Sequence, residues 1–89
     1  MISNKVRIET IQHCLVQALS PTYLSIIDES HLHVGHIGAQ SGGGHFAIEI
    51  SAACLNNISR VVSHQLIYQA LEKLMGTEIH ALRIKVVNT

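Results

Sequence analysis

The sequence predicts an α+β fold: a two-layer α/β sandwich with two helices on one face of a three-stranded mixed sheet. Two segments repeat apolar residues near the helical period of 3.6, and three shorter segments are aliphatic or alternate apolar with polar residues. These segments follow one another in the order helix, strand, strand, helix, strand. Because helices and sheets bury their apolar faces against each other, this order predicts one core between two layers.

The composition predicts one small packed domain that spans residues 1–89. Hydrophobic residues make up 47% of the chain and charged residues 13%, whereas disordered chains are poorer in aliphatic residues and richer in net charge. Six basic residues balance six acidic ones, giving a formal net charge of zero. This balance argues against a strongly basic nucleic-acid-binding surface but leaves room for a local patch.

The first helix follows a cap at Ser3 or Asn4 and ends near Leu19. Its apolar stripe repeats at helical spacing through Val6, Ile8, Ile11, Leu15, Ala18 and Leu19. Ser20-Pro21 ends it, because a proline ring disfavours helical geometry in the residue before it.

Two strands follow, the first over residues 23–27 and the second over residues 46–50. In the second strand, core residues alternate with a wetter face formed by Ala47, Glu49 and Ser51. The connection between the two strands is far longer than a hairpin turn, and loops of this length are usually functional or disordered.

That loop region contains four of the seven histidines: His31, His33, His36 and His45. Histidine binds borderline metals and changes charge near neutral pH. Five glycines in residues 31–44 add backbone freedom, so we expect this segment to be mobile in the free chain while residues 46–50 and 82–86 form protected sheet. His45 directly precedes the strand and is interpreted as a hydrogen-bonding residue at the sheet's end.

The second helix is capped by Asn57 or Ser59 and ends at Gly76, a typical left-handed terminator. Its expected stripe is Val62, Leu66, Ile67, Ala70, Leu71 and Leu74. In the last strand we expect Leu82, Ile84 and Val86 to face the core. Arg83 and Lys85 then face outward, where they form exposed pairs with Glu49.

His80 stands at the start of the last strand, where the edge of the sheet brings it beside the long loop. Together with one loop histidine it forms an open two-ligand half-site, which a partner must complete because a closed site needs more ligands. For His13 and His64 we expect a capping, hydrogen-bonding or solvent role.

The chain shows no sign of catalysis, and we expect a protein that is not an enzyme. It lacks G-x-S-x-G, H-E-x-x-H and P-loop motifs, and Asp28 and Glu29 adjoin, so their carboxylates point apart. Cys14 and Cys54 form no C-x-x-C pair, and Cys14 is interpreted as a small buried hydrophobe. Without a signal-like or membrane-spanning stretch, we expect a cytoplasmic protein with reduced cysteines and no membrane contact.

Four short motifs carry a resemblance to a known family. In chain order they are Asp28-Glu29-Ser30, His45-Phe46, His64-Gln65-Leu66-Ile67-Tyr68 and Ile79-His80-Ala81-Leu82. Because these motifs occur together in this order and at this spacing, the sequence resembles the BolA family along nearly its whole length. The resemblance implies a fold similar to the class II K-homology arrangement, in agreement with the predicted order of elements.

The resemblance also implies a partner, a monothiol glutaredoxin, and a [2Fe-2S] cluster shared with it. Glutathione is then supplied from the partner's side, and the histidine before the last strand, His80, is one ligand from this chain. A histidine in the variable loop is the other. His33 matches the usual position best, and His36 is close enough to replace it.

Two alternatives stay open. Some relatives are proposed to bind DNA, and Arg60, Lys73, Arg83 and Lys85 are candidate phosphate contacts in a transcriptional regulator. However, the Arg-His-Arg that the family often carries reads Ser63-His64-Gln65 here, which removes two arginines. The other alternative is a histidine loop that binds zinc or copper without a cluster. We expect the free chain to be a monomer or a weak homodimer.

Overall fold

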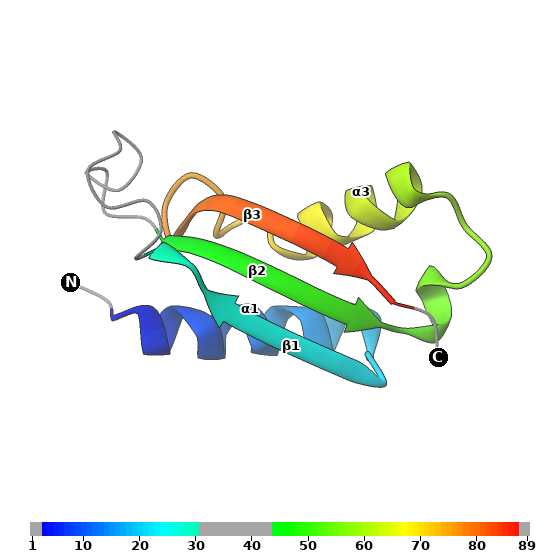
Figure 1. Ribbon diagram of the computed structural model, residues 1–89, viewed down its shortest axis with the longest axis horizontal. Coiled ribbons are helices and arrows are strands. Elements are labelled where there is room, and N and C mark those ends of the chain that lie inside the picture. The colour runs from blue at the N-terminus through cyan, green and yellow to red at the C-terminus, as the bar shows by residue number, and fades with distance from the viewer. Residues whose placement is uncertain (1–2, 31–43, 88–89) are drawn as a thin grey trace.

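The computed structural model describes residues 3–30 and 44–87. Its elements are α1 (Asn4–Leu19), β1 (Tyr23–Asp28), β2 (Gly44–Ser51), the 3₁₀ turn η2 (Ala53–Leu55), α3 (Arg60–Ala70) and β3 (Ile79–Val86). The two helices cover one face of the sheet (Figure 1). The predicted order of elements and the two-layer α+β fold are therefore confirmed.

Helix α1 begins and ends where its flanking residues predict. The side-chain oxygen of Ser3 accepts a hydrogen bond from the Val6 backbone N–H, which caps the first turn. Ser20 adopts a left-handed conformation with φ of 48° and donates its backbone N–H to the Val16 carbonyl. Pro21 follows and prevents the helix from continuing.

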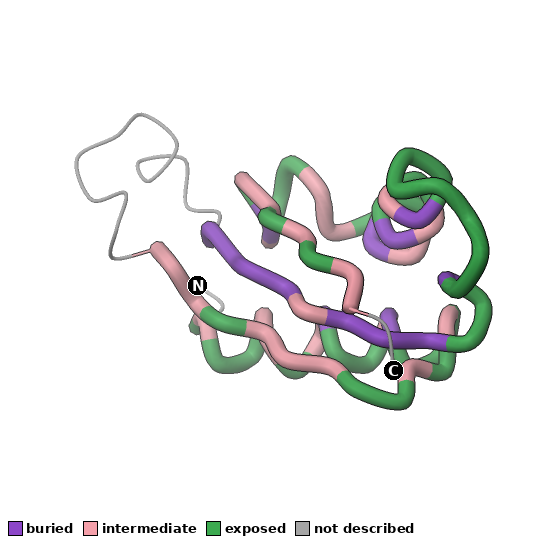
Figure 2. The backbone as a smooth tube through the Cα atoms, turned by 45° about the vertical axis from the view of Figure 1, so that its right-hand side comes forward, coloured by how far each residue is buried: buried purple, intermediate pink, exposed green. Residues whose placement is uncertain are grey.

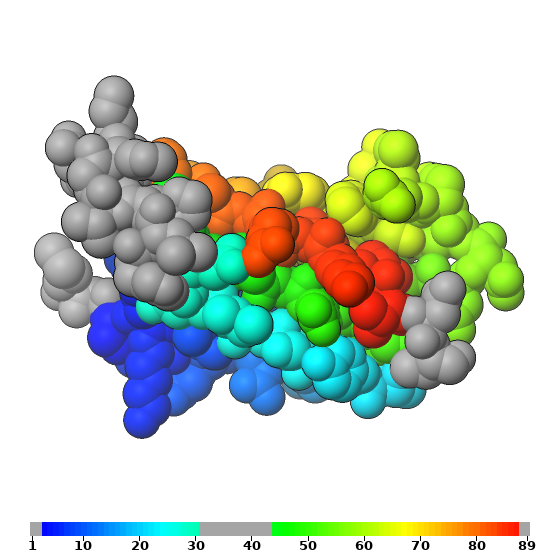
Figure 3. Space-filling model, viewed as in Figure 1, coloured from blue at the N-terminus to red at the C-terminus, as the bar shows by residue number. Residues whose placement is uncertain are grey.

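The sheet has the order β1-β2-β3, with β2 antiparallel to β1 and parallel to β3. The mixed sheet is thus confirmed, but the expected wetter face of the middle strand is largely wrong. Ala47 and Ser51 are buried and only Glu49 is partly exposed, because a strand on each side covers β2 (Figure 2). Figure 3 shows only small green areas of β2 between β1 in cyan and β3 in orange to red.

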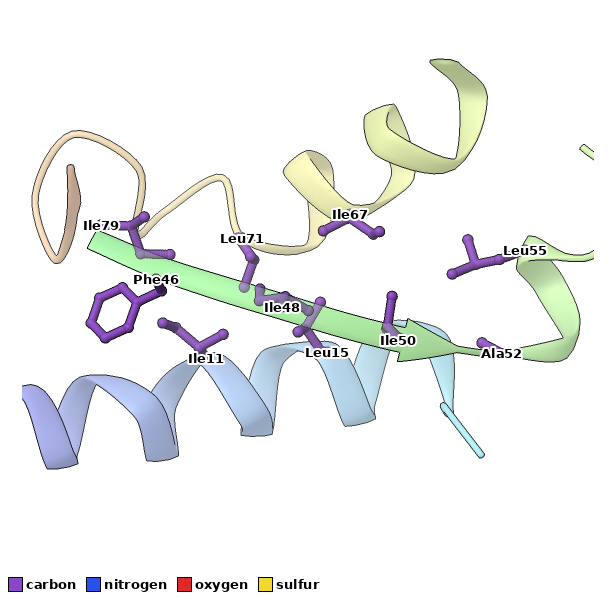
Figure 4. Close-up of a cluster of buried hydrophobic side chains, with 10 residues drawn as sticks. All are labelled: Ile11, Leu15, Phe46, Ile48, Ile50, Ala52, Leu55, Ile67, Leu71 and Ile79. Atoms are coloured by element: carbon purple, nitrogen blue, oxygen red, sulfur yellow. The ribbon is translucent and has the colours of Figure 1, made fainter. Parts of the chain in front are cut away.

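The core lies between the sheet and the two helices (Figure 4). Its buried members are Ile11 and Leu15 from α1, Phe46, Ile48 and Ile50 from β2, Ala52, Leu55, Ile67, Leu71 and Ile79. Leu82, Ile84 and Val86 of β3 pack against this cluster, as predicted. A core made almost wholly of aliphatic side chains therefore holds both layers together.

Helix α3 differs from its predicted stripe and length. Ser59, not Asn57, caps it, and it ends at Ala70 instead of reaching Gly76. Gly76 does have a positive φ of 85°, but it lies in the turn that leads into β3 and donates its N–H to the Ile79 carbonyl. Ile67 and Leu71 are buried and Leu66, Ala70 and Leu74 pack against the core, as predicted. Only Val62 departs from the expected stripe, since it is 41% exposed while Ser63 is buried.

The charged residues of the sheet do not pair as expected either. The Arg83 guanidinium binds the Glu29 carboxylate, with 3.3 Å between Nε and Oε1, and not Glu49. Glu49 instead accepts a hydrogen bond from the Tyr23 hydroxyl at 3.5 Å. Among the described residues, no helix is both long and apolar enough to cross a bilayer.

Candidate functional site

His80 lies at the start of β3, next to an irregularity in the pairing of β3 with β2. Gly44 pairs with Ile79 and His45 pairs with Ala81, so His80 is the extra residue in this register. Irregularities of this kind redirect a side chain away from the regular alternation of a strand. Ile79 is fully buried whereas His80 is exposed, so the strand presents this imidazole at the molecular surface.

A second imidazole, that of His45, lies directly beside His80. The centroids of the two rings are 5.3 Å apart, and the ring planes are inclined by 45°. His45 belongs to β2 and is only 7% exposed, whereas His80 belongs to the neighbouring strand and faces outward. One buried and one exposed imidazole therefore form a pair at this end of the sheet, which we call the histidine pair.

Ser30 and Gly44, the described residues on either side of positions 31–43, are hydrogen-bonded close to the histidine pair. The His45 backbone N–H donates to the Ser30 hydroxyl at 3.1 Å, and the His45 carbonyl accepts from the Glu29 N–H at 2.7 Å. The Gly44 N–H donates to the Glu78 carbonyl at 3.1 Å. The described residues Ser30 and Gly44 therefore both lie at the end of the sheet that carries His80.

The first turn of α1 braces this end of the sheet. The Asn4 side-chain amide donates to the Asp28 carboxylate at 2.8 Å and to the Ser30 hydroxyl at 3.3 Å. Arg7 bonds the Glu78 carboxylate, with 3.0 Å between Nε and Oε1. These contacts fix the residues that flank the segment 31–43 and the histidine pair.

Of the predicted ligands, the structure describes only His80, which is exposed near the start of β3. His33 and His36, like His31, lie outside the described residues. Within residues 3–30 and 44–87, no group of three or more histidine, cysteine or carboxylate side chains is arranged to hold a metal ion. A metal ion bound at His80 would therefore need ligands from outside the described residues.

His45 is the residue that sequence reasoning missed. Its backbone does hydrogen-bond at the sheet's end, as predicted, but its imidazole also packs against that of His80. Part of this contact could be predicted from the sequence, since His45 and His80 each lie near the start of a strand and the two strands are parallel neighbours. Their contact depends on the shifted register at Gly44 and His45, which the sequence pattern does not reveal.

The remaining candidates lie away from this pair. Cys14 is partly buried against the core, as expected of a small hydrophobe, and Cys54 is exposed with its thiol 3.6 Å from the Leu19 carbonyl. His13 is exposed on α1, and His64 is half-buried on α3. Asp28 and Glu29 bind different partners, Asn4 and Arg83, so the prediction that their carboxylates point apart is confirmed.

Comparison with known proteins places this architecture in a family. A family model described as BolA-like protein matches residues 15–89. The DNA-binding transcriptional regulator BolA of Haemophilus influenzae is 37% identical over 76 residues, which cover 85% of this chain and 71% of that protein. The BolA domain of SufE1 from Arabidopsis thaliana has a TM-score of 0.77 and 31% identity, covering 90% of this chain and 88% of that chain. BolA1 from Arabidopsis thaliana has a TM-score of 0.76 and 27% identity, covering 92% and 90%.

Proposed function

Because the chain belongs to the BolA-like protein family, we propose that it is a non-catalytic adaptor that binds a monothiol glutaredoxin and shares a bridging [2Fe-2S] cluster with it. In this proposal His80 is one ligand from the chain, and His33 or His36 is the other. Glutathione and the remaining ligands come from the partner's side. The function is then the transfer of clusters or the sensing of iron and redox state.

The observation that supports this proposal is the position of His80. Its imidazole is exposed, so a partner can reach it without unfolding the sheet. Ser30 and Gly44, which flank the segment that carries His33 and His36, are both hydrogen-bonded to residues next to the histidine pair. An exposed imidazole beside a histidine-containing segment fits a half-site that a second protein completes.

The donor type fits the proposed group as well. When histidine replaces thiolate on one iron, a [2Fe-2S] cluster gains a higher potential and a ligand that can titrate. The chain's own part is to present His80 on a rigid strand and to limit its movement through the buried imidazole of His45 beside it. A half-site of this kind is suited to reversible binding, because only one side of the coordination depends on this chain.

The test is reconstitution with the partner. The purified chain is mixed with a monothiol glutaredoxin, iron, sulfide and glutathione, and visible absorption, circular dichroism and size-exclusion elution are recorded. We expect a spectrum that differs from that of the glutaredoxin alone, together with a complex that elutes earlier. His80→Ala should reduce the new spectral features strongly, and His33→Ala should reduce them more than His31→Ala.

His13→Ala is the matched control, because that imidazole is exposed on α1 and lies away from the histidine pair. It should leave both the spectrum and the elution unchanged. The proposal fails if the spectrum stays that of the glutaredoxin alone and no complex elutes.

A second candidate function, DNA binding by a transcriptional regulator, is favoured by the name of the Haemophilus influenzae relative. Arg83, one of its candidate phosphate contacts, is paired with Glu29, whereas Arg60 and Lys85 line one common groove. The test is a salt series with duplex DNA, because phosphate contacts give a steep loss of affinity with added salt. Weak binding with no sequence preference near physiological salt would exclude this function.

A further inference from the structure

A groove lies between the start of α3 and the end of β3, and its volume is about 520 Å³. Arg60 and His64 of α3 are among the residues that line it, as are Ile84, Lys85 and Val86 of β3. Pockets of about 300–1,000 Å³ are the usual size for small ligands or a few residues of a bound peptide. We call this feature the α3–β3 groove.

The charges of the α3–β3 groove are unbalanced. Arg60 and Lys85 line it, and none of its lining residues carries a carboxylate. Elsewhere in the described chain Arg7 and Arg83 form ion pairs with Glu78 and Glu29, but Arg60 and Lys85 form none. Two cationic residues that form no ion pair among the described residues thus line one concave site, which favours an anionic ligand.

The rest of the lining is apolar. Leu55, Ile84 and Val86 form part of the walls, and Ile58 remains 38% exposed at the rim. Nearby on α3, Val61 is 66% exposed, which extends the apolar surface beyond the groove. A ligand that fits must therefore bring apolar groups as well as negative charge.

We propose that the α3–β3 groove binds an acidic segment of a partner protein, with aliphatic side chains in the groove and carboxylates on Arg60 and Lys85. An acidic peptide supplies both kinds of group. A nucleic acid would need a broad basic face, whereas this chain has a formal net charge of zero and offers two cations and His64 at this site. The observations therefore favour a peptide.

This site is separate from the histidine pair and goes beyond the proposed cluster function. Lys85 lies five positions after His80 in β3, a span of about 17 Å along a strand. Figure 1 shows the start of β3 at one end of the molecule, and the end of β3 and the first turn of α3 at the other. A partner at the histidine pair would leave the groove accessible to a second protein.

The test uses two synthetic peptides in an NMR titration of the ¹⁵N-labelled full chain. The first has the sequence Asp-Glu-Leu-Ile-Asp-Glu, and the second replaces each acid by its amide. We expect the acidic peptide to shift the amide resonances of Ile58, His64 and Lys85 in a saturable way. The amide-containing peptide should bind about tenfold more weakly or not at all, because it lacks the charges that meet Arg60 and Lys85.

Charge-removing variants separate this site from general electrostatic attraction. The double variant Arg60→Gln/Lys85→Gln should weaken binding of the acidic peptide about tenfold. Lys5→Gln/Lys73→Gln removes the same charge outside the groove and should change affinity by less than about twofold. Both variants should keep the circular dichroism spectrum of the parent, since all four side chains belong to exposed residues.

Three results would overturn the proposal. They are no saturable shifts at the groove with the acidic peptide, equal weakening by both double variants, or tighter binding of a single-stranded oligonucleotide to the same residues. None of these results bears on the cluster, whose readout is the visible spectrum with glutaredoxin. The two proposals can therefore fail independently.

Discussion

At the scale of single residues, Asn4 links three parts of the fold. Its amide nitrogen donates to Asp28 and Ser30, and its amide oxygen accepts from the Arg7 guanidinium at 2.8 Å. Ser30 in turn accepts the His45 backbone N–H. The Asn4 side chain thus joins helix α1 to Asp28 and Ser30. Its amide nitrogen donates and its amide oxygen accepts, so both polar groups of the side chain are used.

The two ion pairs should differ in their contribution to stability. The Arg7 side chain is 11% exposed and bonds both Glu78 and Asn4, whereas the Arg83 side chain is 74% exposed. We expect Arg7→Gln to lower the free energy of unfolding by about 1–2 kcal/mol, because it leaves partly buried acceptors unsatisfied. Arg83→Gln should cost at most about 0.5 kcal/mol, since solvent screens an exposed pair.

Urea unfolding followed by circular dichroism measures both values under the same conditions. Raising the salt concentration provides a control, because it should reduce the small contribution of Arg83 further. Equal losses for the two variants would contradict this ranking.

At the scale of elements, the inward face of α3 decides which of its residues support the core. Ile67 is fully buried, whereas Val62 is 41% exposed although its spacing predicts a core position. We expect Ile67→Ala to lower the free energy of unfolding by about 2–4 kcal/mol through the cavity it leaves. Val62→Ala should change stability by less than about 0.5 kcal/mol, since it removes little buried surface and alanine favours helix.

Thermal or urea unfolding of the two variants tests this assignment. The helical signal of each folded variant should match that of the parent chain. A larger loss for Val62→Ala than for Ile67→Ala would show that the helix presents the opposite face.

The sequence predicts elements well where local chemistry determines them. Ser3 and Pro21 determine the bounds of α1, and the alternation of Leu82, Ile84 and Val86 determines the inward face of β3. Helix α3 is harder to predict, because its stripe contains a buried polar residue, Ser63, beside an exposed valine. A prediction from hydrophobicity alone therefore places Val62 in the core, where the structure has Ser63.

The candidate site is only partly predictable for a related reason. The position of His80 follows from its place at the start of the last strand, but its contact with His45 depends on a non-local register shift between β2 and β3. The α3–β3 groove likewise joins residues more than twenty positions apart in sequence, such as Arg60 and Lys85. Periodicity within one element carries no information about such contacts.

At the scale of the whole molecule, the two proposed sites lie at opposite ends of the sheet. Strands β2 and β3 run parallel, so their starts bring the histidine pair together, while the end of β3 meets the start of α3 (Figure 1). The buried core runs along β2, and this one strand extends from the end of the sheet with the histidine pair to the opposite end. If both proposals hold, two partners would bind at opposite ends of the sheet.

The same arrangement predicts how stability is distributed along the chain. Strand β2 is almost entirely buried and pairs with a strand on each side, whereas β1 and β3 each pair with no strand other than β2 among the described residues, and β1 exposes Ile27 by 53%. Alternate amides of an edge strand point away from its neighbour and exchange readily. We therefore expect the amides of residues 46–50 to exchange most slowly, followed by those of residues 82–86, with alternate amides of β1 faster.

NMR-detected amide exchange on the ¹⁵N-labelled chain measures this order, and Ile67→Ala identifies its cause. If the β2 amides exchange only through global unfolding, their exchange rates should rise in Ile67→Ala by the factor that corresponds to its loss of unfolding free energy. That factor is about tenfold for each 1.4 kcal/mol. The outward amides of β1 open locally, so their rates should stay nearly constant.

Slow exchange across residues 34–44 would contradict the mobility expected of the histidine-containing segment and would favour a ready-made metal site. Fast exchange there, with β2 protected, would mean that the half-site is assembled when the partner binds.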